Sequence, residues 1–306
     1  MKNKIVYVSQ ALSMLETMGL TAITPIEIND GGNLIIHLSP YPFVARISTT
    51  LSEEDPELAY QIEERELRVA DHLRVQNVPV LRYADTVDAG PHNIGGSWMT
   101  LWKYEPRVNL QRPSPAEAIK LIGKLSDAMQ CYPGELPSLG TWESTCKSAF
   151  RLRDNSDPRV QTLLEIFQRV NMKMQNETEF LIPCHGDAHI GNLYPSNNGW
   201  IWMDFENVSL MPKYWDLACF ISILALFKGI QEPTLSCVLD KIESKTDLRS
   251  FGLALVARTL TSTLGNLDYA LIGHADIDFA IKELECAEEF IKQIDHITGG
   301  DIIAYM

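Results

Sequence analysis

Residues 181–206, LIPCHGDAHIGNLYPSNNGWIWMDFE, set the narrowest limits on how this chain can fold. The apolar run at the start has the composition of a short strand, and it leads into a polar loop that carries Asp187 and Asn192. A second apolar run ends at Met203 and is followed by Asp204. The pattern therefore predicts two strand-like segments that bracket three side chains with oxygen atoms.

Such a set of oxygen atoms suits phosphoryl transfer from a magnesium nucleotide. In that chemistry one carboxylate orients the attacking hydroxyl, while hard oxygen ligands hold the metal against the phosphates. The catalytic loop of protein kinases has four residues between its Asp and Asn, and a second Asp, followed by Phe, comes on the next strand. Asp187, Asn192 and an Asp-Phe pair at Asp204 repeat this spacing. The tripeptide HGD, which begins at His185, stands where a kinase has His-Arg-Asp.

The segment resembles the aminoglycoside phosphotransferase and choline kinase family, whose loop has the form HGDxHxGN followed by DFE or a close relative. This chain has HGDAHIGN from His185 and DFE from Asp204. The resemblance implies a protein-kinase-like α+β fold. Its smaller N-terminal lobe would hold an antiparallel sheet and one helix, and its larger C-terminal lobe would be mainly helical. The layout matches over most of the chain, and the specific matches lie within residues 183–220.

A zinc site is an alternative for the same loop. His185 and His189 are four residues apart, which on a helix would place both imidazoles on one face with Asp187 nearby. Pro183 and Gly186 disfavour a helix here, and the pattern of a third ligand is missing. We therefore interpret His185 as a residue that braces the loop.

A hairpin is predicted by the segments 23–28 and 34–38. Its turn holds Gly31, Gly32 and Asn33. In the resembled fold this turn covers the nucleotide phosphates, because glycines let backbone N–H groups approach the oxygens closely. Taken alone, the turn is that of an ordinary hairpin.

The next predicted strand, residues 43–47, carries Arg46 in an apolar run, where an unpaired charge would be costly. The resemblance implies a basic residue at this position that holds phosphates, usually lysine, and an acid on the following helix that pairs with it. We expect that helix at residues 57–75. Glu66 is the first choice for the acid and Glu63 the near alternative, although single glutamates on a charged helix are more often solvated. An arginine binds phosphate with a different, bidentate geometry.

An apolar, aromatic strand then ends where a kinase-like chain passes from the small lobe to the large one. The resemblance implies that adenine binds to backbone groups of Leu101, Trp102 and Lys103. The domain boundary follows from this position. Residues 1–104 would form the nucleotide-binding lobe, and residues 105–306 the catalytic and acceptor-binding lobe.

Helical periodicity dominates the rest of the chain, with helices predicted at 115–131, 158–174, 214–227, 231–244, 248–272 and 275–295. The resemblance implies that Asp216, in a DLA context, braces the catalytic loop; an ordinary acid near a helix N-terminus explains it equally well. No role follows for Glu206. Carboxylates that could form an acceptor pocket are Asp268, Asp276, Asp278, Glu283 and Glu285.

The charge of the chain bears on its partners. It has 26 Lys and Arg against 40 Asp and Glu, and the net charge of −14 disfavours nucleic acid and anionic membrane surfaces and favours a cationic substrate. Acidity for solubility alone is an equally good explanation. The six cysteines include no CxxC pair, which indicates reduced core residues. Without a signal-peptide pattern or a membrane-length apolar run, a cytoplasmic protein is expected.

Together these patterns predict an enzyme that moves the γ-phosphate of ATP or GTP, with Mg²⁺, to a hydroxyl of a small cationic molecule. Aminoglycosides are the first choice of acceptor, followed by choline, homoserine or a macrolide. Asp187 would orient the hydroxyl, Asn192 and Asp204 would bind Mg²⁺, and Arg46 with Glu66 would hold the phosphates. A protein Ser/Thr kinase and a catalytically inactive nucleotide-binding regulator remain alternatives, the second because arginine replaces the usual lysine.

Overall fold

The computed structural model describes residues 4–30, 32–176 and 180–304. The chain divides into two compact units. The first comprises Met1–Leu110 and Leu193–Glu206, and the second comprises Gln111–Asn192 and Asn207–Met306. Asp204 therefore belongs to the first unit, whereas Asp187 and Asn192 belong to the second.

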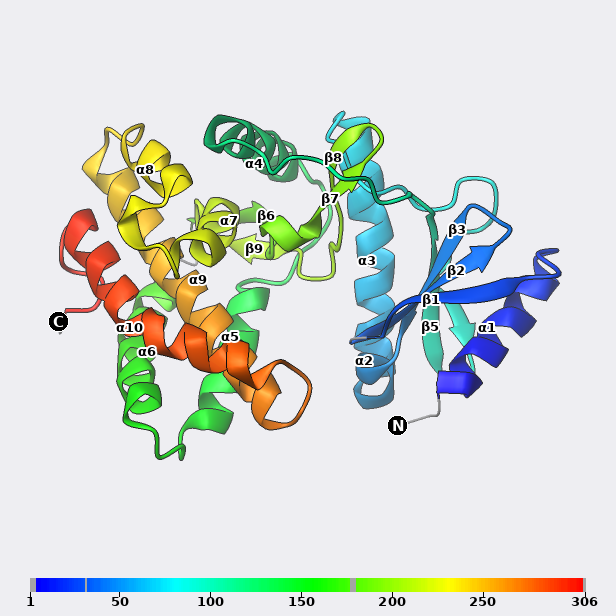
Figure 1. Ribbon diagram of the computed structural model, residues 1–306, viewed down its shortest axis with the longest axis horizontal. Coiled ribbons are helices and arrows are strands. Elements are labelled where there is room, and N and C mark those ends of the chain that lie inside the picture. The colour runs from blue at the N-terminus through cyan, green and yellow to red at the C-terminus, as the bar shows by residue number, and fades with distance from the viewer. Residues whose placement is uncertain (1–3, 31, 177–179, 305–306) are drawn as a thin grey trace. The chain divides into compact units, whose positions relative to one another are not determined.

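The described part of the first unit is built on a five-stranded antiparallel sheet in the order β1-β2-β3-β5-β4 (Figure 1). Its strands are β1 Thr24–Asp30, β2 Asn33–Ser39, β3 Phe43–Ser48, β4 His92–Ile94 and β5 Ser97–Lys103. The helices of the unit are α1 Lys4–Thr17, α2 Thr50–Glu54 and α3 Pro56–Val75. The structure thus has the predicted hairpin, the predicted strand around Arg46 and the helix expected after it.

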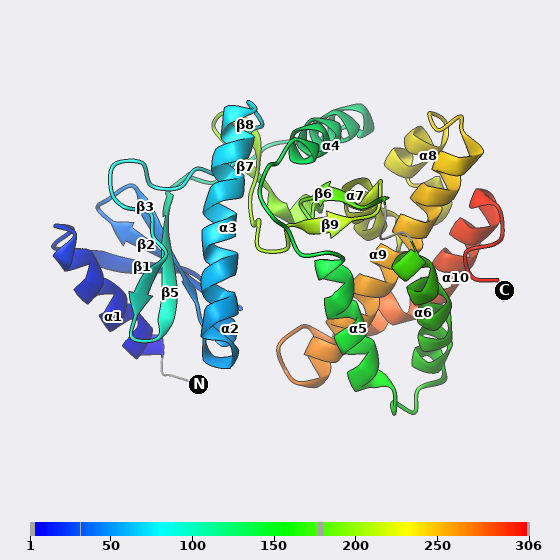
Figure 2. The same ribbon diagram turned by 180° about the vertical axis from the view of Figure 1, so that it is seen from behind.

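Helices cover both faces of this sheet, because strands such as β3 have buried side chains on both faces. Side chains alternate between the two faces of a strand. Phe43, Ala45 and Ile47 lie in the hydrophobic core that includes Ala11 and Leu15 of α1. Figures 1 and 2 show α1 and α3 on opposite sides of the sheet. Arg46, which lies between Ala45 and Ile47 in β3, therefore points to the α3 side.

A hairpin of β7 Leu193–Ser196 and β8 Gly199–Trp202 completes the first unit. The backbone of Trp202 hydrogen bonds to Pro79 and Leu81, and Trp202 is fully buried. Val80 also forms a single bridge with Trp202. These contacts fix the end of β8, two residues before Asp204.

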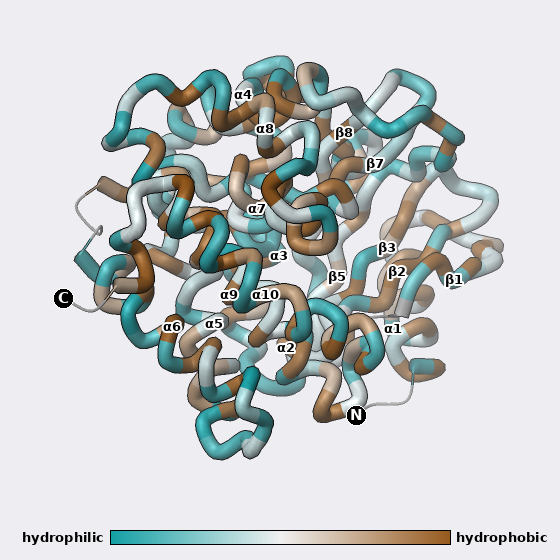
Figure 3. Tube along the Cα trace, turned by 60° about the vertical axis from the view of Figure 1, so that its left-hand side comes forward, coloured by the Kyte–Doolittle hydropathy of each residue, from teal (hydrophilic) through white to brown (hydrophobic). Residues whose placement is uncertain are grey.

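The second unit is mainly helical (Figure 2). Its short strands β6 Ile182–Cys184 and β9 Ser209–Met211 pair with each other. The long helix α9 packs against α10, α5 and α7, and Figure 3 shows hydrophilic and hydrophobic residues alternating along the helices. The α-helices are α4 Pro115–Gln130, α5 Gly140–Leu152, α6 Pro158–Asn176, α7 Trp215–Ala225, α8 Pro233–Leu239, α9 Lys245–Leu271 and α10 Ile277–Thr298, and short 3₁₀ helices span Ile190–Asn192 and Gly229–Gln231.

Helix α5 has no counterpart among the predicted elements. Its buried face combines Trp142 and Ala149 with the polar residues Thr141, Thr145 and Ser148. Hydroxyl side chains on the buried face interrupt the apolar period that marks an amphipathic helix in a sequence. Among the described residues, no helix combines the length and apolar character needed to cross a bilayer.

Gly252 and Gly265 both lie in α9, but their surroundings differ. A Cβ at Gly252 would lie 2.4 Å from Oγ1 of Thr298 in α10, whereas a Cβ at Gly265 would meet no described atom within 4 Å. Because alanine favours a helix, we expect Gly265→Ala to raise the free energy of unfolding by about 0.5–1 kcal/mol. Gly252→Ala should lower it by about 1–3 kcal/mol, because the α9–α10 contact becomes overpacked. Urea unfolding measures both changes, and equal shifts would contradict the close packing.

Candidate active site

The polar loop between β6 and β7 is held by Asp216, at the start of α7. The Asp216 carboxylate accepts hydrogen bonds from the backbone N–H groups of His185 at 2.9 Å and Gly186 at 3.0 Å. Asp216 is buried, and burial raises the pKa of its carboxyl group. The two charge-assisted bonds offset the cost of burying this carboxylate, so the loop backbone and Asp216 depend on each other.

Gly186 occupies a position in this loop that no other residue fits. Its φ is +85°, and a Cβ there would lie 2.0 Å from the carbonyl oxygen of Asn207. Its own carbonyl oxygen accepts a hydrogen bond from Trp215 Nε1 at 2.8 Å. The glycine of the HGD motif is therefore required by both backbone conformation and close packing.

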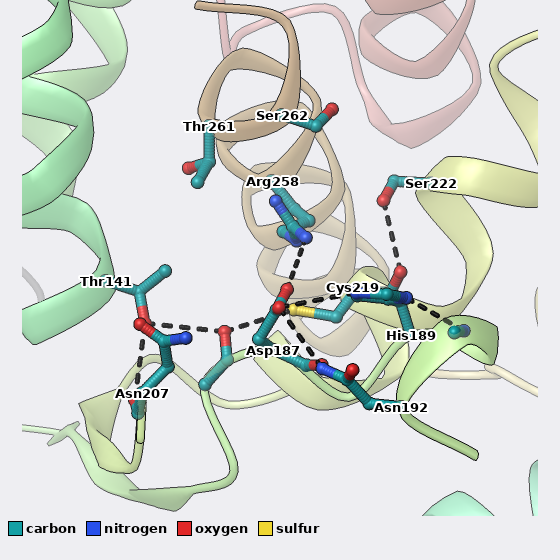
Figure 4. A network of polar contacts seen from close by, with 12 residues as sticks. Thr141, Asp187, His189, Asn192, Asn207, Cys219, Ser222, Arg258, Thr261 and Ser262 are labelled. Atoms are coloured by element: carbon teal, nitrogen blue, oxygen red, sulfur yellow. Dashed lines mark hydrogen bonds and ion pairs between the residues drawn. The ribbon is translucent and has the colours of Figure 1, made fainter. Parts of the chain in front are cut away.

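Asp187 and Asn192 lie next to each other in the loop (Figure 4). Asn192 Nδ2 donates to the backbone oxygen of Asp187 at 2.9 Å and approaches Asp187 Oδ2 at 3.3 Å. His189 Nε2 lies 3.4 Å from the same Oδ2. Because the amide nitrogen of Asn192 is bound to Asp187, its carbonyl oxygen Oδ1 is the atom that would ligate a metal.

Arg258 of α9 contacts the other oxygen of Asp187, with Nη2 2.6 Å from Oδ1 (Figure 4). Burial raises the pKa of Asp187, but the charges of Arg258, His189 and His185 outweigh burial and hold the pKa below its ordinary range. Asp187 is therefore ionised at neutral pH. Arg258 was not among the residues predicted from the sequence, although it too is a charge within an apolar run, LALVARTL, which is the signal that identified Arg46.

In the first unit, Arg46 is the centre of a buried cluster of charges. Nη1 lies 2.6 Å from Glu63 Oε1 and 2.8 Å from Glu66 Oε2, and Nη2 lies 2.5 Å from Glu206 Oε2. Arg46 contacts both candidate glutamates of α3, because the two lie three residues apart on the helix face that covers β3. Thr100, opposite Arg46 in the sheet, donates to Glu63 at 2.9 Å.

Negative charge is in excess in this cluster. Burial lowers the pKa of Arg46, but the charges of Glu63, Glu66 and Glu206 outweigh it and the pKa lies above its ordinary value. Burial, together with the charges of Glu63, Asp204 and Glu206, raises the pKa of Glu66 to about 8, although the charge of Arg46 lowers it. The first unit therefore concentrates carboxylates around one guanidinium, which favours the binding of a further cation.

Glu66 also links the cluster to the segment around Asp204. Its Oε1 accepts the backbone N–H of Phe205 at 2.9 Å. Asp204 has a φ of +67°, a left-handed conformation that Asp adopts more readily than most residues. Glu206, for which the sequence suggested no role, binds Arg46 and accepts a hydrogen bond from Asn33 Nδ2 at 3.1 Å.

The other expected nucleotide-binding positions also lie in the first unit. Gly31 lies outside the described residues, and Gly32 precedes β2, which begins at Asn33. In β5, the N–H of Leu101 donates to Ala89 at 2.9 Å, and its carbonyl oxygen accepts from Ala84 at 2.8 Å. Both backbone groups of Leu101 are thus engaged within the protein. The N–H groups of Trp102 and Lys103 lie on opposite sides of the strand.

The carboxylates considered for an acceptor pocket have different surroundings. Asp268 pairs with an arginine of α5, Asp276 caps the N-terminus of α10, and Glu285 lies 3.7 Å from an arginine of α6. Glu283 is fully buried, and its Oε2 accepts from Asn266 Nδ2 at 2.6 Å. Most of these acids therefore already have structural roles.

The chain carries donor atoms of the kind that magnesium prefers. Asn192 in the second unit has an amide oxygen and Asp204 in the first unit has a carboxylate, and Mg²⁺ takes few protein ligands because it retains water and binds phosphate oxygens. In the described part of the chain, no three His, Cys, Asp or Glu side chains gather as a set able to hold a metal by themselves. His185 and His189 both lie in the loop that precedes the 3₁₀ turn Ile190–Asn192, and not on an α-helix.

We expect Arg46→Met to lower the free energy of unfolding by about 3–5 kcal/mol, because it leaves buried carboxylates without their counter-charge. Arg68→Met is the matched control, since Arg68 lies on α3 with its side chain 57% exposed and pairs only with Glu64 among the ion pairs described. The control should change stability by less than about 0.5 kcal/mol. Chemical denaturation compares the variants, and equal losses would show that the cluster does not depend on Arg46.

Comparisons with known proteins identify a family for this chain. The model of the Phosphotransferase enzyme family (APH) matches residues 37–233. A comparison with curated protein sequences finds no significant match.

Solved structures show the same fold. The choline kinase LicA from Streptococcus pneumoniae is 14% identical and has a TM-score of 0.66, covering 94% of this chain and 99% of its own. The amicoumacin kinase hAmiN, solved with AMP-PNP, Ca²⁺ and Ami, is 14% identical with a TM-score of 0.68, covering 98% and 97%. An ethanolamine kinase of Plasmodium vivax is 13% identical with a TM-score of 0.61, covering 96% and 92%.

At these identities the similarity establishes the fold, which is the protein-kinase-like α+β fold that the sequence predicted. The family model covers well over half of the chain. The protein therefore belongs to the phosphotransferase enzyme family.

Proposed function

We propose that this protein transfers the γ-phosphoryl group of a magnesium nucleotide, ATP or GTP, to a hydroxyl group of a small cationic molecule. The pairing of Asp187 with Asn192 supports this most directly. The Asn192 amide nitrogen holds the backbone and Oδ2 of Asp187, and Asp216 fixes the backbone that precedes them. The chain therefore presents a carboxylate for a hydroxyl and an amide oxygen for a metal from one braced loop.

Asp187 accepts a hydrogen bond from the acceptor hydroxyl and orients its oxygen for in-line attack on the γ-phosphorus. The bond from that phosphorus to the β–γ bridging oxygen breaks, and the hydroxyl proton passes to Asp187 and then to solvent. Bound Mg²⁺ neutralises charge on the phosphates. Asn192 and Asp204 are the residues that would hold it, and the excess of carboxylates around Arg46 favours a cation nearby.

Arg46 binds the nucleotide phosphates in this proposal, with Glu66 and Glu63 fixing its Nη1 from α3. Its Nη2 partner Glu206 is the most exposed of the three acids, with 36% of its side chain accessible. A phosphate oxygen would therefore replace Glu206, because water can solvate the released carboxylate. Asn33 and Gly32, with Gly31, would lie over the phosphates.

Adenine would bind to the backbone where β5 ends. The N–H and carbonyl groups of Leu101 already have partners in the protein, so the carbonyl group of Lys103, the last residue of β5, is the better acceptor for an adenine amine. Trp102, the residue before Lys103, would belong to the same adenine-binding segment.

The net charge of −14 supports an acceptor with an ammonium group. The solved relatives include a choline kinase, an ethanolamine kinase and an aminoglycoside phosphotransferase in complex with ADP and hygromycin B. Choline and ethanolamine both combine a hydroxyl with a cationic nitrogen. Compounds of this kind, aminoglycosides first among them, are the acceptors we propose.

Asp187→Asn should lower kcat by about 10²–10⁴-fold, because the asparagine cannot accept the hydroxyl proton. Its affinity for AMP-PNP with Mg²⁺ should stay within about twofold, since this role is exercised in the transition state. The measurement is acceptor-dependent release of nucleoside diphosphate with choline, ethanolamine, homoserine, hygromycin B, other aminoglycosides and a macrolide. Calorimetry gives the nucleotide affinity.

Asp154→Asn is the matched control, because the Asp154 side chain is 85% exposed and lies outside the proposed site. It should leave both kcat and nucleotide affinity unchanged. Wild-type turnover by Asp187→Asn would refute the role of Asp187. Failure of the wild-type protein to bind any magnesium nucleotide would refute the proposed function as a whole.

A further inference from the structure

Arg258 lies in the middle of α9, where every residue from Phe251 to Leu260 is buried. It is only 7% exposed, and a guanidinium in such surroundings is costly unless it is paired. Its Nη2 reaches Asp187 Oδ1 at 2.6 Å. Helix α9 thus carries a buried cation whose short contact is with the carboxylate that we assign to the acceptor hydroxyl.

The pairing of Arg258 is not that of a purely structural residue. Its Nε–H is buried and has no hydrogen-bond partner among the described residues. Oε1 of Glu283 is also buried without a hydrogen-bond partner among the described residues. Glu283 is, with Asp187, one of the two acids that raise the pKa of Arg258. Buried ion pairs that only support the fold usually have their polar atoms satisfied. Unmet donors and acceptors beside a reactive carboxylate indicate a functional arrangement.

The charges around Arg258 agree with this. Burial lowers the pKa of Arg258, but its contacts with Cys219 and Asp187 and the nearby Glu283 outweigh burial and raise it. Burial raises the pKa of the Cys219 thiol and of the Glu283 carboxyl group, whereas the pKa of Asp187 is lowered. Asp187 is therefore the ionised partner in direct contact with Arg258.

The face of α9 that carries Arg258 becomes more exposed towards the C-terminal end of the helix. Ser262, Gly265 and Tyr269 follow Arg258 at spacings of four, three and four residues, so they share one face of the helix. A Cβ at Gly265 would meet no described atom within 4 Å, and Tyr269 is 53% exposed. Figure 4 shows Arg258 directed from α9 to Asp187.

We propose that Arg258 is a positioning residue for the phosphoryl transfer proposed above, on which this inference rests. It holds Oδ1 of Asp187, so that the acceptor hydroxyl meets Oδ2. The contacts of Oδ2 with Asn192 and His189, at 3.3 and 3.4 Å, are longer than that of Oδ1 and easier to replace. Without Arg258 the carboxylate is free to rotate, and the hydroxyl loses its fixed direction of attack.

The test compares Arg258→Met and Arg258→Lys with wild type in acceptor phosphorylation. For Arg258→Met we expect kcat to fall roughly 10- to 100-fold, as for other residues that orient a reacting group. KM for the nucleotide should change by less than about twofold, because the nucleotide does not depend on this contact. Arg258→Lys should recover part of kcat, since it restores the charge without the planar fork.

Arg249→Met is the matched control. Arg249 lies on the same helix, but its side chain is 58% exposed and pairs with Asp301. This variant should match wild type in kcat and KM. Thermal unfolding and circular dichroism establish that each variant is folded, and Arg258→Lys carries the comparison if Arg258→Met does not fold. A wild-type kcat in a folded Arg258→Met or Arg258→Lys variant would overturn the inference.

A double variant separates positioning from a general structural effect. If Arg258 acts through Asp187, adding Arg258→Met to Asp187→Asn should change the residual kcat by less than about twofold. If the losses of kcat from the two substitutions multiply in the double variant, Arg258 does not act through Asp187. If wild type transfers phosphate to no acceptor, the proposed function and this inference fall together. If wild type is active and the Arg258 variants equal it, only the inference falls.

Discussion

The buried carboxylate of Asp216 fixes the loop on which the candidate site depends. Two backbone N–H groups, from His185 and Gly186, bind this carboxylate, and the turn at Gly186 is too crowded for a side chain. Asp187 follows Gly186 directly, and Asn192 lies five residues further on. Backbone hydrogen bonds to the Asp216 carboxylate at the start of α7 thus fix the segment that leads into Asp187, and contacts with Arg258 and Asn192 set the direction of the Asp187 carboxylate.

Both units use the same physical rule for buried charge. Arg46 in β3 and Arg258 in α9 each lie within an apolar element, and each is compensated by carboxylates from distant parts of the chain. In the first unit the acids outnumber the base, which favours the binding of a further cation. In the second unit the short ion pair engages one oxygen of Asp187 and leaves the other with weaker contacts. Buried charges are costly, so their retention at these positions agrees with a functional role.

The sequence was sufficient for the parts of the fold that have strong local signals. The loop spacing, the sheet around Arg46 and the long amphipathic helices follow from motifs and periodicity, and the family resemblance supplied the fold class. Helix α5 was not predicted, because hydroxyl residues interrupt the apolar pattern of its buried face. The contacts of Glu206 and Arg258 were not predicted, because they join residues more than 70 positions apart and no local sequence pattern indicates such pairs. For Arg258, however, the charge in an apolar run was a usable signal.

Phosphorus NMR of the protein with magnesium, ATP and an acceptor follows the transferred group itself. If the chain moves a phosphoryl group to an alcohol, a new phosphomonoester signal should grow as the γ-phosphate signal falls, and it should need both the acceptor and the enzyme. If the γ-phosphate is converted only to inorganic phosphate, or is not consumed with any of the proposed acceptors, the assignment of Asp187 as the residue that orients an acceptor hydroxyl is wrong.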